Sequence, residues 1–558
     1  MKKYSIIILI GFLFACQSKS GSDIQFEQIR NSFIQSWWKQ FPTSASSAGF
    51  HEYDAELEPY NQATRESDKV FVSAWLDTLS KLDNGKMEAN DLTDLALMKG
   101  ALHSILFYSD TLKAWQWDPS NYNVAGAFAD IINAKNLDSI QKRKSIQSRI
   151  KKVKSYYEAA KENIINPSPE HTQLAIDQSE GVKEYLNSEV SNWLETKSDL
   201  QEAVTAIDGF SSYLKTILPT AKRDFRIGKE LFDIKFKHDI QSEWTAAEVY
   251  EKAINRKKEL HLEMAKLTND LWSKYMNVEM PKDTLKAISL LINKISDKHA
   301  HRDSFMQSIE KQIPELQAFV NEKQLLFLDP KKPLKVRRTP GYMDGVAGAS
   351  ISAPGPYDKD AETFYNVSTL EKFTKESAES YLREYNHYIL QILNIHEAIP
   401  GHYAQLVYSN NSPSIIKSVF GNGAMVEGWA VYTERMMIEA GYGNAEPEML
   451  LMYNKWHLRT VCNTILDYSV HVKGWKKEDA IHLLVDEAFQ QQAEAEGKWK
   501  RVQLSQVQLC SYFTGYSEIY ALREEMKKKK DFDLKKFHES FLSYGSAPVK
   551  EIKKLMLK

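Results

Sequence analysis

Two histidines and a glutamate stand close together in the segment "NIHEAIPGHYAQ", residues 394–405. Imidazole nitrogens and carboxylate oxygens are the usual zinc ligands of hydrolases, many of which carry the helical pattern H-E-x-x-H. Histidines four positions apart share one face of a helix because each residue advances the helix by about 100°. Here His402 follows His396 by six positions, and a regular helix would turn it about 240° away.

The two residues that precede His402 are a proline and a glycine. Pro400 has no backbone N–H, and in a regular helix its ring clashes with the carbonyl of His396, four residues earlier. Gly401 permits backbone torsions that other residues resist. We therefore predict that the helix breaks at residues 399–402 and that His402 swings back beside His396.

A catalytic zinc site needs three protein ligands, an open position for water and a carboxylate that takes the proton of that water. The segment at residues 421–443 is predicted to be a helix bounded by glycines, with Glu427 in its first turn. We predict that Glu427 is the third ligand of one zinc ion per chain, while Glu397 accepts the proton. Glu434 lies two turns further on the same face, where it would orient a histidine ligand. The alternative is a chance pairing, since the chain has 14 His and 74 acidic residues.

Nearly all of the chain has apolar residues three and four positions apart, which indicates a mainly α fold. The exception is residues 328–369, which are rich in proline and glycine and contain a short predicted strand, "TFYNVS". This small β element stands just before residues 374–397, predicted as one long buried helix that ends in the histidine motif. The strand would hold an extended substrate by β-augmentation. The predicted division is an N-terminal helical region at about 17–230 and a catalytic region at 231–558.

The overall charge of the chain argues against nucleic acid as a partner. Its 558 residues carry a formal net charge of −2, so no basic excess is present to neutralise phosphates. Two of its three cysteines, Cys462 and Cys510, lie in apolar helical surroundings. They either pair with each other or stay as buried free thiols.

The N-terminal segment "MKKYSIIILIGFLFACQSKSGSD" is typical of a secretory signal, with two lysines before an apolar run that is too short to span a membrane. Its "LFAC" is similar to a bacterial lipobox. Residues 1–16 are therefore predicted to be a lipoprotein signal peptide, and Cys16 to be lipidated. The alternative is a cleaved signal with an incidental cysteine. The exported protein would be held in the bacterial cell envelope, at the outer membrane or the periplasmic face, by its lipid anchor alone.

The histidine segment "HEAIPGHYAQ" is followed by "VEGWAVYTE", then by "RTVCNTILDYSVHVKGWKKEDAI", "QLCSYFTG" and "FDLKKFHESFLSYGSAPV". Together these segments resemble the bacterial "domain of unknown function 885" family, which is similar to zincin-type metallopeptidases. The resemblance extends from about residue 330 to the end of the chain. It departs from the family pattern at Asn463 and Phe513, where basic residues are expected.

The resemblance implies a zincin-like fold of many helices around a deep cleft, with Glu397 as the base and zinc held by His396, His402 and Glu427. It makes Tyr512 and His471 candidates for stabilising the oxyanion as hydrogen-bond donors. Arg459 is a candidate for binding a substrate carboxylate. For His471 and Arg459 a structural role is equally open.

These features lead to one principal hypothesis for function and two alternatives. The principal hypothesis is a lipid-anchored zinc peptidase that hydrolyses short peptides, as an exopeptidase or a dipeptidase-like enzyme. One alternative is a non-catalytic lipoprotein that binds peptides or metal on a peptidase scaffold. The other is an amidase that uses the same metal chemistry on cell-wall peptides.

Overall fold

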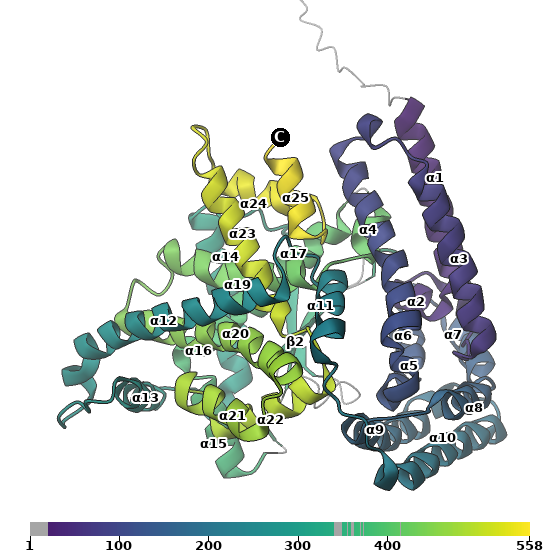
Figure 1. Cartoon of the computed structure of the whole chain (residues 1–558), viewed down its shortest axis with the longest axis horizontal. Coiled ribbons are helices and arrows are strands. Elements are labelled where there is room, and N and C mark those ends of the chain that lie inside the picture. Colours follow the sequence, from purple (N-terminus) through teal and green to yellow (C-terminus); the bar gives the residue numbers. More distant parts are fainter. Residues whose placement is uncertain are drawn as a thin grey trace, which may run out of the picture.

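The structure is a computed structural model that describes residues 21–339, 349–353, 355–358, 362–368, 370–371, 373–412 and 414–558. The predicted signal peptide at 1–16, with Cys16, and part of the proline- and glycine-rich segment lie outside these residues. Within them no helix is both long enough and apolar enough to cross a bilayer. The described chain is mainly helical, with one small sheet, as predicted (Figure 1).

The first part of the chain forms ten α-helices. They are α1 (Gly21–Gln40), α2 (Pro42–Ser47), α3 (Gln62–Ser80), α4 (Ala89–Leu106), α5 (Ala114–Trp117), α6 (Ala125–Asn133), α7 (Ser139–Ile150), α8 (Val153–Asn163), α9 (Pro169–Ser188) and α10 (Lys197–Ile217). Four helices and the sheet follow: α11 (Gly228–Asp239), α12 (Ala246–Tyr275), α13 (Thr284–Ile295), α14 (Phe305–Glu322), β1 (Leu334–Arg338), β2 (Ala349–Ser352) and β3 (Thr363–Val367).

The last part of the chain carries the histidine motif and the helices around it. They are α15 (Lys375–Glu384), α16 (His387–Glu397), α17 (His402–Asn410), α18 (Ile415–Val419), α19 (Gly423–Glu439), α20 (Pro447–Lys473), α21 (Lys477–Ile481), α22 (Gln492–Leu504), α23 (Cys510–Met526), α24 (Leu534–Ser543) and α25 (Val549–Met556). In Figure 1 these helices cluster on one side of the molecule, and α1, α3 and α4 stand on the other.

Two hydrophobic cores divide the molecule at a different place from the predicted boundary near residue 230. The smaller core is built mainly from α6 to α10, with residues from Leu57 to Leu214. The larger core joins α1 to α4 with the helices from α11 onward, so residues on both sides of position 230 share it. The first helices therefore belong with the region predicted at 231–558, because their buried aromatic side chains pack there.

The small sheet is attached directly to the helix that carries the histidine motif. Its order is β1-β3-β2, with β1 parallel and β2 antiparallel to β3. The predicted strand is therefore confirmed as β3, and the Tyr365 hydroxyl on it donates to the Asn394 side chain on α16 at 2.8 Å. Because β3 is central, it has no edge on which a substrate strand can pair. The edge strands are β1 and β2, and this corrects the strand expected to hold the substrate.

The region predicted as one long helix at residues 374–397 is two helices, α15 and α16. The side chain of Asn386 accepts hydrogen bonds from the backbone N–H groups of Tyr388 at 3.1 Å and Ile389 at 3.3 Å. Asparagine competes for backbone donors in this way and so favours a helix start over a helix interior. Apolar residues three and four positions apart continue through the whole segment 374–397, but the helical backbone is interrupted between α15 and α16.

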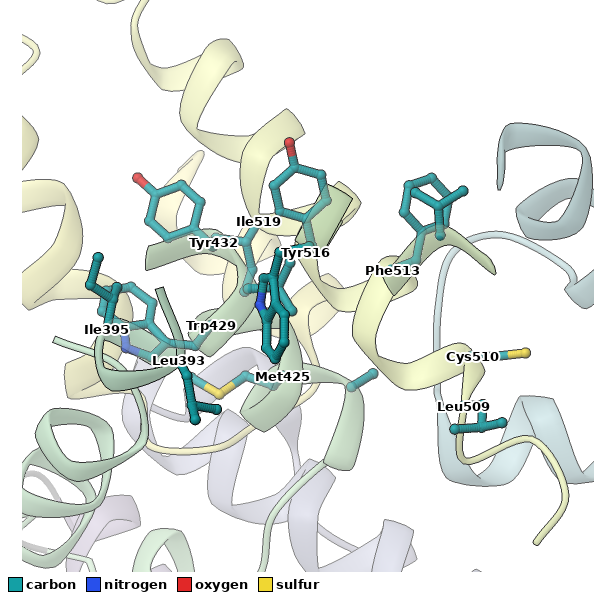
Figure 2. Packing of buried hydrophobic residues seen from close by; sticks show 14 of the residues in the cluster. Leu393, Ile395, Met425, Trp429, Tyr432, Leu509, Cys510, Phe513, Tyr516 and Ile519 are labelled. Atoms are coloured by element: carbon teal, nitrogen blue, oxygen red, sulfur yellow. The ribbon is translucent and has the colours of Figure 1, made fainter. Parts of the chain in front are cut away.

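Helix α19, which carries Glu427, is held mainly by α23. Figure 2 shows Trp429 and Tyr432 of α19 beside Tyr516 and Ile519 of α23. The two backbones approach so closely that a Cβ atom on Gly515 would lie 1.7 Å from the carbonyl oxygen of Ala424. A glycine at this position therefore fixes how near α19 can come to its neighbour.

Replacing Gly515 with alanine is expected to destabilise the fold by about 1–3 kcal/mol, because the new methyl group forces α19 and α23 apart. Thermal or urea unfolding measures this loss. The matched control is Gly209→Ala on the exposed face of α10, where an added Cβ meets no atom within 4 Å. That change should be neutral or stabilise by about 0.5–1 kcal/mol. Equal stability of the two variants would contradict the packing account.

Cys462 and Cys510 are both buried and free, so the structure contains no bond between them. Of the two states that the sequence left open, a disulfide or buried free thiols, the structure has the free thiols.

Candidate metal centre

The histidine motif is broken where the sequence predicted a break. Helix α16 ends at Glu397, the Ile399–Pro400 peptide bond is cis, and α17 begins at His402. The ring centroids of His396 and His402 are 4.9 Å apart. The turn thus brings together two imidazoles that a regular helix would point in different directions.

Gly401 is required in this turn because of space. A Cβ atom on it would lie 1.9 Å from the carbonyl oxygen of His396 and 2.4 Å from that of Ile395. Its backbone angles, φ −74° and ψ −128°, lie in neither the helical nor the extended region, which agrees with the torsional freedom that the sequence suggested. The indole N–H of Trp429 on α19 donates to the carbonyl of Pro400 at 3.0 Å and fastens the turn to the helix of Glu427.

Glu427 completes a set of three metal-binding side chains. One of its carboxylate oxygens lies 3.4 Å from Nε2 of His402 and 3.7 Å from Nε2 of His396. The ligand atoms of the three residues all lie within 4.8 Å of one another. Two ligands bound to one tetrahedral zinc at about 2.0–2.1 Å are about 3.3 Å apart. The separations in the structure therefore fit a zinc ion held by one carboxylate and two imidazoles.

Glu434 orients the first of these histidines, as the sequence predicted. Its carboxylate is fully buried and lies 2.7 Å from Nδ1 of His396. The indole N–H of Trp456 donates to the same oxygen at 3.0 Å. With Nδ1–H donated to Glu434, the lone pair of His396 is on Nε2, which faces Glu427. This carboxylate–histidine pair is the usual support of a metal-bound imidazole.

The electrostatics of the cluster favour a cation. Burial opposes charge on His396, but the hydrogen bonds with Glu427 and Glu434 raise the pKa of this imidazole well above its usual value. Burial also opposes charge on Glu427, yet hydrogen bonds from the two histidines lower the pKa of its carboxyl group. Burial raises the pKa of Glu397. Three carboxylates around two imidazoles leave an excess of negative charge, which a divalent cation would balance.

Replacing Glu434 with glutamine is expected to lower the affinity for zinc by about 10–100-fold, because the neutral amide orients His396 less strongly. Competition with a chelator of known affinity measures the change. Glu310→Gln is the matched control, since Glu310 is exposed on α14 and remote from the cluster in the chain. Unchanged zinc affinity in the Glu434 variant would show that the second carboxylate does not support the site.

The three candidate ligands and Glu397 line a cavity of about 1220 Å³. Tyr512 and Arg459, both predicted from the sequence, line it as well. The hydroxyl oxygen of Tyr512 accepts a hydrogen bond from Arg501 at 3.0 Å, which leaves its own O–H group able to donate. The guanidinium of Arg459 forms an ion pair with Glu494 and lies 4.8 Å over the ring of Trp456. The remaining walls include aromatic and aliphatic side chains: Phe373, Tyr381, Tyr385, Leu393, Leu406 and Val426.

Comparison with known families identifies the chain. A family model described as "Bacterial protein of unknown function (DUF885)" matches residues 42–556. The chain belongs to the DUF885 family. A comparison of this DUF885 chain with curated proteins gave no match.

Two solved structures are similar to the DUF885 chain over nearly its whole length. One, described as a "putative lipoprotein of unknown function" from Shewanella oneidensis, is 51% identical, with a TM-score of 0.86 and coverage of 97% of this chain and 100% of the other. The second, described as a "putative lipoprotein" from Colwellia psychrerythraea, is 16% identical, with a TM-score of 0.78 and coverage of 96% and 98%. The second likeness shows the same fold.

His471 of the DUF885 chain does not lie in the cavity, which corrects its assignment as an oxyanion donor. Its ring is 2% exposed, and Nε2 lies 2.9 Å from the carbonyl oxygen of Val502 and 3.0 Å from that of Ser505. Burial lowers its pKa to about 4, so the ring is neutral. Asp467, one turn earlier, accepts from the backbone N–H groups of Val507 and Leu509. These two residues brace the loop before α23, the helix that carries Tyr512.

The two positions where the resemblance leads us to expect basic residues, 463 and 513, have different surroundings in the DUF885 chain. Phe513 is buried in the large core, beside Tyr516. Asn463 lies at the cavity, and its side-chain oxygen accepts a hydrogen bond from Lys498 on α22 at 2.8 Å. A basic group is thus present beside Asn463, but it comes from another helix. Sequence reasoning missed Lys498 because a lysine in a charged helix usually faces solvent.

Proposed function

We propose that this DUF885 protein is a zinc-dependent peptidase that hydrolyses short peptides. The observation that carries the proposal is the convergence of His396, His402 and Glu427 on one point of a cavity that Glu397 also lines. Two histidines, one glutamate and a neighbouring free carboxylate are the residues found in catalytic zinc sites of peptidases. A purely structural zinc site would have four protein ligands and no such carboxylate beside it.

His396, His402 and Glu427 would hold the zinc, which when bound acidifies a water molecule and polarises the carbonyl of the scissile bond. Glu397 accepts the proton of the attacking water at its carboxylate and returns it to the leaving amine. Its raised pKa, caused by burial, makes it a stronger base than an exposed glutamate. Tyr512, which lines the same cavity, would donate its O–H to the developing oxyanion.

The cavity supports a peptide as the substrate. Its aromatic and aliphatic walls suit peptide side chains, and three residues of the edge strand β2 (Ala349, Ser350 and Ile351) also line it. An extended peptide would pair with this edge by main-chain hydrogen bonds, as strands added to a sheet do. A cavity of about 1220 Å³ limits the substrate to a short peptide or a chain end.

We also propose that the protein is exported and anchored to the bacterial cell envelope through a lipid on Cys16. The support is the lipobox-like "LFAC" and the description of the relative from Shewanella oneidensis, 51% identical, as a "putative lipoprotein of unknown function". An anchored enzyme would meet peptides outside the cytoplasm. Its peptide substrates are then products of proteolysis in that compartment.

The direct test of the proposed activity uses purified protein, from residue 17 on, and a library of short peptides. We expect one zinc per chain by elemental analysis, hydrolysis that stops when a chelator removes the metal, and recovery when zinc is restored. Zinc binding without turnover of any peptide would favour a non-catalytic binding protein. Cleavage of muropeptides but not of ordinary peptides would favour a cell-wall amidase.

A further inference from the structure

Lys498 is an unusual lysine, because it is buried in the cavity wall without an acidic partner. Its side chain lines the cavity and is only 4% exposed. Its ammonium group donates to the neutral side-chain oxygen of Asn463 at 2.8 Å. Among the described residues no carboxylate lies within ion-pairing distance of it. Charged side chains are rarely buried in this way unless they bind something.

The acids nearest to Lys498 are already engaged by other cations. Glu494 pairs with Arg459, and Glu384 pairs with Lys455 at 2.9 Å. Arg501, one turn beyond Lys498 on α22, also lines the cavity, and its guanidinium donates to the neutral side chains of Gln508 and Tyr512. This wall therefore has more positive than negative charge, and the excess belongs to the two residues of α22.

The surroundings of Lys498 disfavour the charged form of its side chain. Burial and the neighbouring Arg459 lower the pKa of its ammonium group well below the usual value. A negatively charged group beside the ammonium would remove this penalty, since an opposite charge within a few ångströms favours the charged form. The cavity admits such a group only from a ligand, because both nearby carboxylates are in use.

The wall adjoins the candidate metal centre through α20. Arg459 lies one helical turn after Trp456, whose indole N–H donates to Glu434, and Glu434 in turn holds His396. A substrate group bound at this wall would therefore be close to a peptide bond held at the metal centre.

We propose that Lys498, assisted by Arg459 and Arg501, forms a subsite that binds a carboxylate of the substrate. The inference rests on the proposed peptidase function and specifies its substrates as peptides that place a carboxylate beside the scissile bond. The source of that carboxylate is the C-terminus of the peptide or an Asp or Glu side chain. Arg459 was expected to bind the substrate carboxylate. Because Glu494 already balances the charge of Arg459, Lys498 is the main cation of this subsite.

The test measures binding to the metal-free full-length mature protein, so that a carboxylate cannot bind to zinc. The probes for calorimetry are Ala-Phe, its C-terminal amide, and Ala-Glu amide, which carries its only carboxylate on a side chain. We expect Ala-Phe to bind about 10–100-fold more tightly than its amide, as for hydrogen bonds to a charged group. Comparable affinity for Ala-Glu amide would assign the side chain as a second source; weak binding would assign the C-terminus.

Lys498→Met should abolish this preference for the acid, because its side chain has a similar length but no charge. Lys500→Met is the matched control: it removes the same charge from the same helix at an exposed position outside the cavity wall. Arg501→Gln, also exposed, is a second variant that should weaken acid binding by about two- to fivefold without affecting the fold. Circular dichroism checks that each variant is folded.

The subsite is overturned if neither Ala-Phe nor Ala-Glu amide binds more tightly than Ala-Phe amide, or if neither binds at all. These outcomes are independent of the proposed activity. If the zinc-loaded protein hydrolyses peptides while acid and amide bind equally, the function stands and the subsite falls. If the metal-free protein prefers the acid but the loaded protein hydrolyses nothing, the subsite stands and the peptidase proposal falls.

Discussion

Replacing Glu397 with glutamine is expected to lower kcat by about 10²–10⁴-fold while the protein keeps one zinc per chain. Glutamine has nearly the same shape as glutamate, but its amide cannot accept the proton of the attacking water. Because Glu397 is not one of the three converging ligands, the metal should stay. Steady-state hydrolysis of a short peptide, together with elemental analysis of zinc, measures both effects.

Glu310→Gln, the same chemical change on the exposed face of α14, should leave hydrolysis and zinc content unchanged. Hydrolysis by the Glu397 variant at the rate of the unaltered protein would exclude this residue as the base. Loss of zinc in the same variant would instead place Glu397 among the ligands and call for a different base.

Replacing Gly401 with alanine is expected to weaken zinc binding by about 100-fold or more, and hydrolysis with it. The added methyl group would overlap the backbone carbonyl of His396 at 1.9 Å, and neither atom belongs to a flexible side chain. The turn between α16 and α17 must therefore open, which moves His402 away from His396 and Glu427. Loss of a ligand of this kind removes most of the affinity of a three-residue site.

The matched control for this change is Gly423→Ala at the start of α19. An added Cβ there meets no atom within 4 Å, although the position is only four residues before Glu427. Zinc titration should find this control unchanged. If the Gly401 variant binds zinc as tightly as the control does, the turn is not what positions His402.

The centre of the site was predictable from sequence because its chemistry leaves a local signature. The spacing of His396 and His402 is wrong for a regular helix, and Pro400 and Gly401 supply the break that corrects it. The predicted role of Glu434 also followed from helical periodicity, since it lies two turns after Glu427 on one helix. The lack of space for a side chain at Gly401 was not predictable, because a backbone clash depends on the folded turn.

Other features depended on contacts between distant segments and could not be read from local patterns. His471 matches a family motif, but only the fold shows that carbonyl groups some 30 residues later enclose its ring. Lys498 looks like a surface lysine until α22 packs on α20 and buries it beside Asn463. The shared core on both sides of residue 230 could not be predicted for the same reason, because the aromatic residues of the first helices pack on segments far along the chain.

A crystal structure of the zinc-loaded protein, with anomalous data collected at the zinc absorption edge, would show directly whether the three side chains hold the metal. We predict a single anomalous peak at about 2.0–2.2 Å from Nε2 of His396, Nε2 of His402 and a carboxylate oxygen of Glu427. The carboxylate of Glu397 should face the open coordination position. No peak at this point, or a zinc ion bound by other residues, would contradict the proposed metal centre.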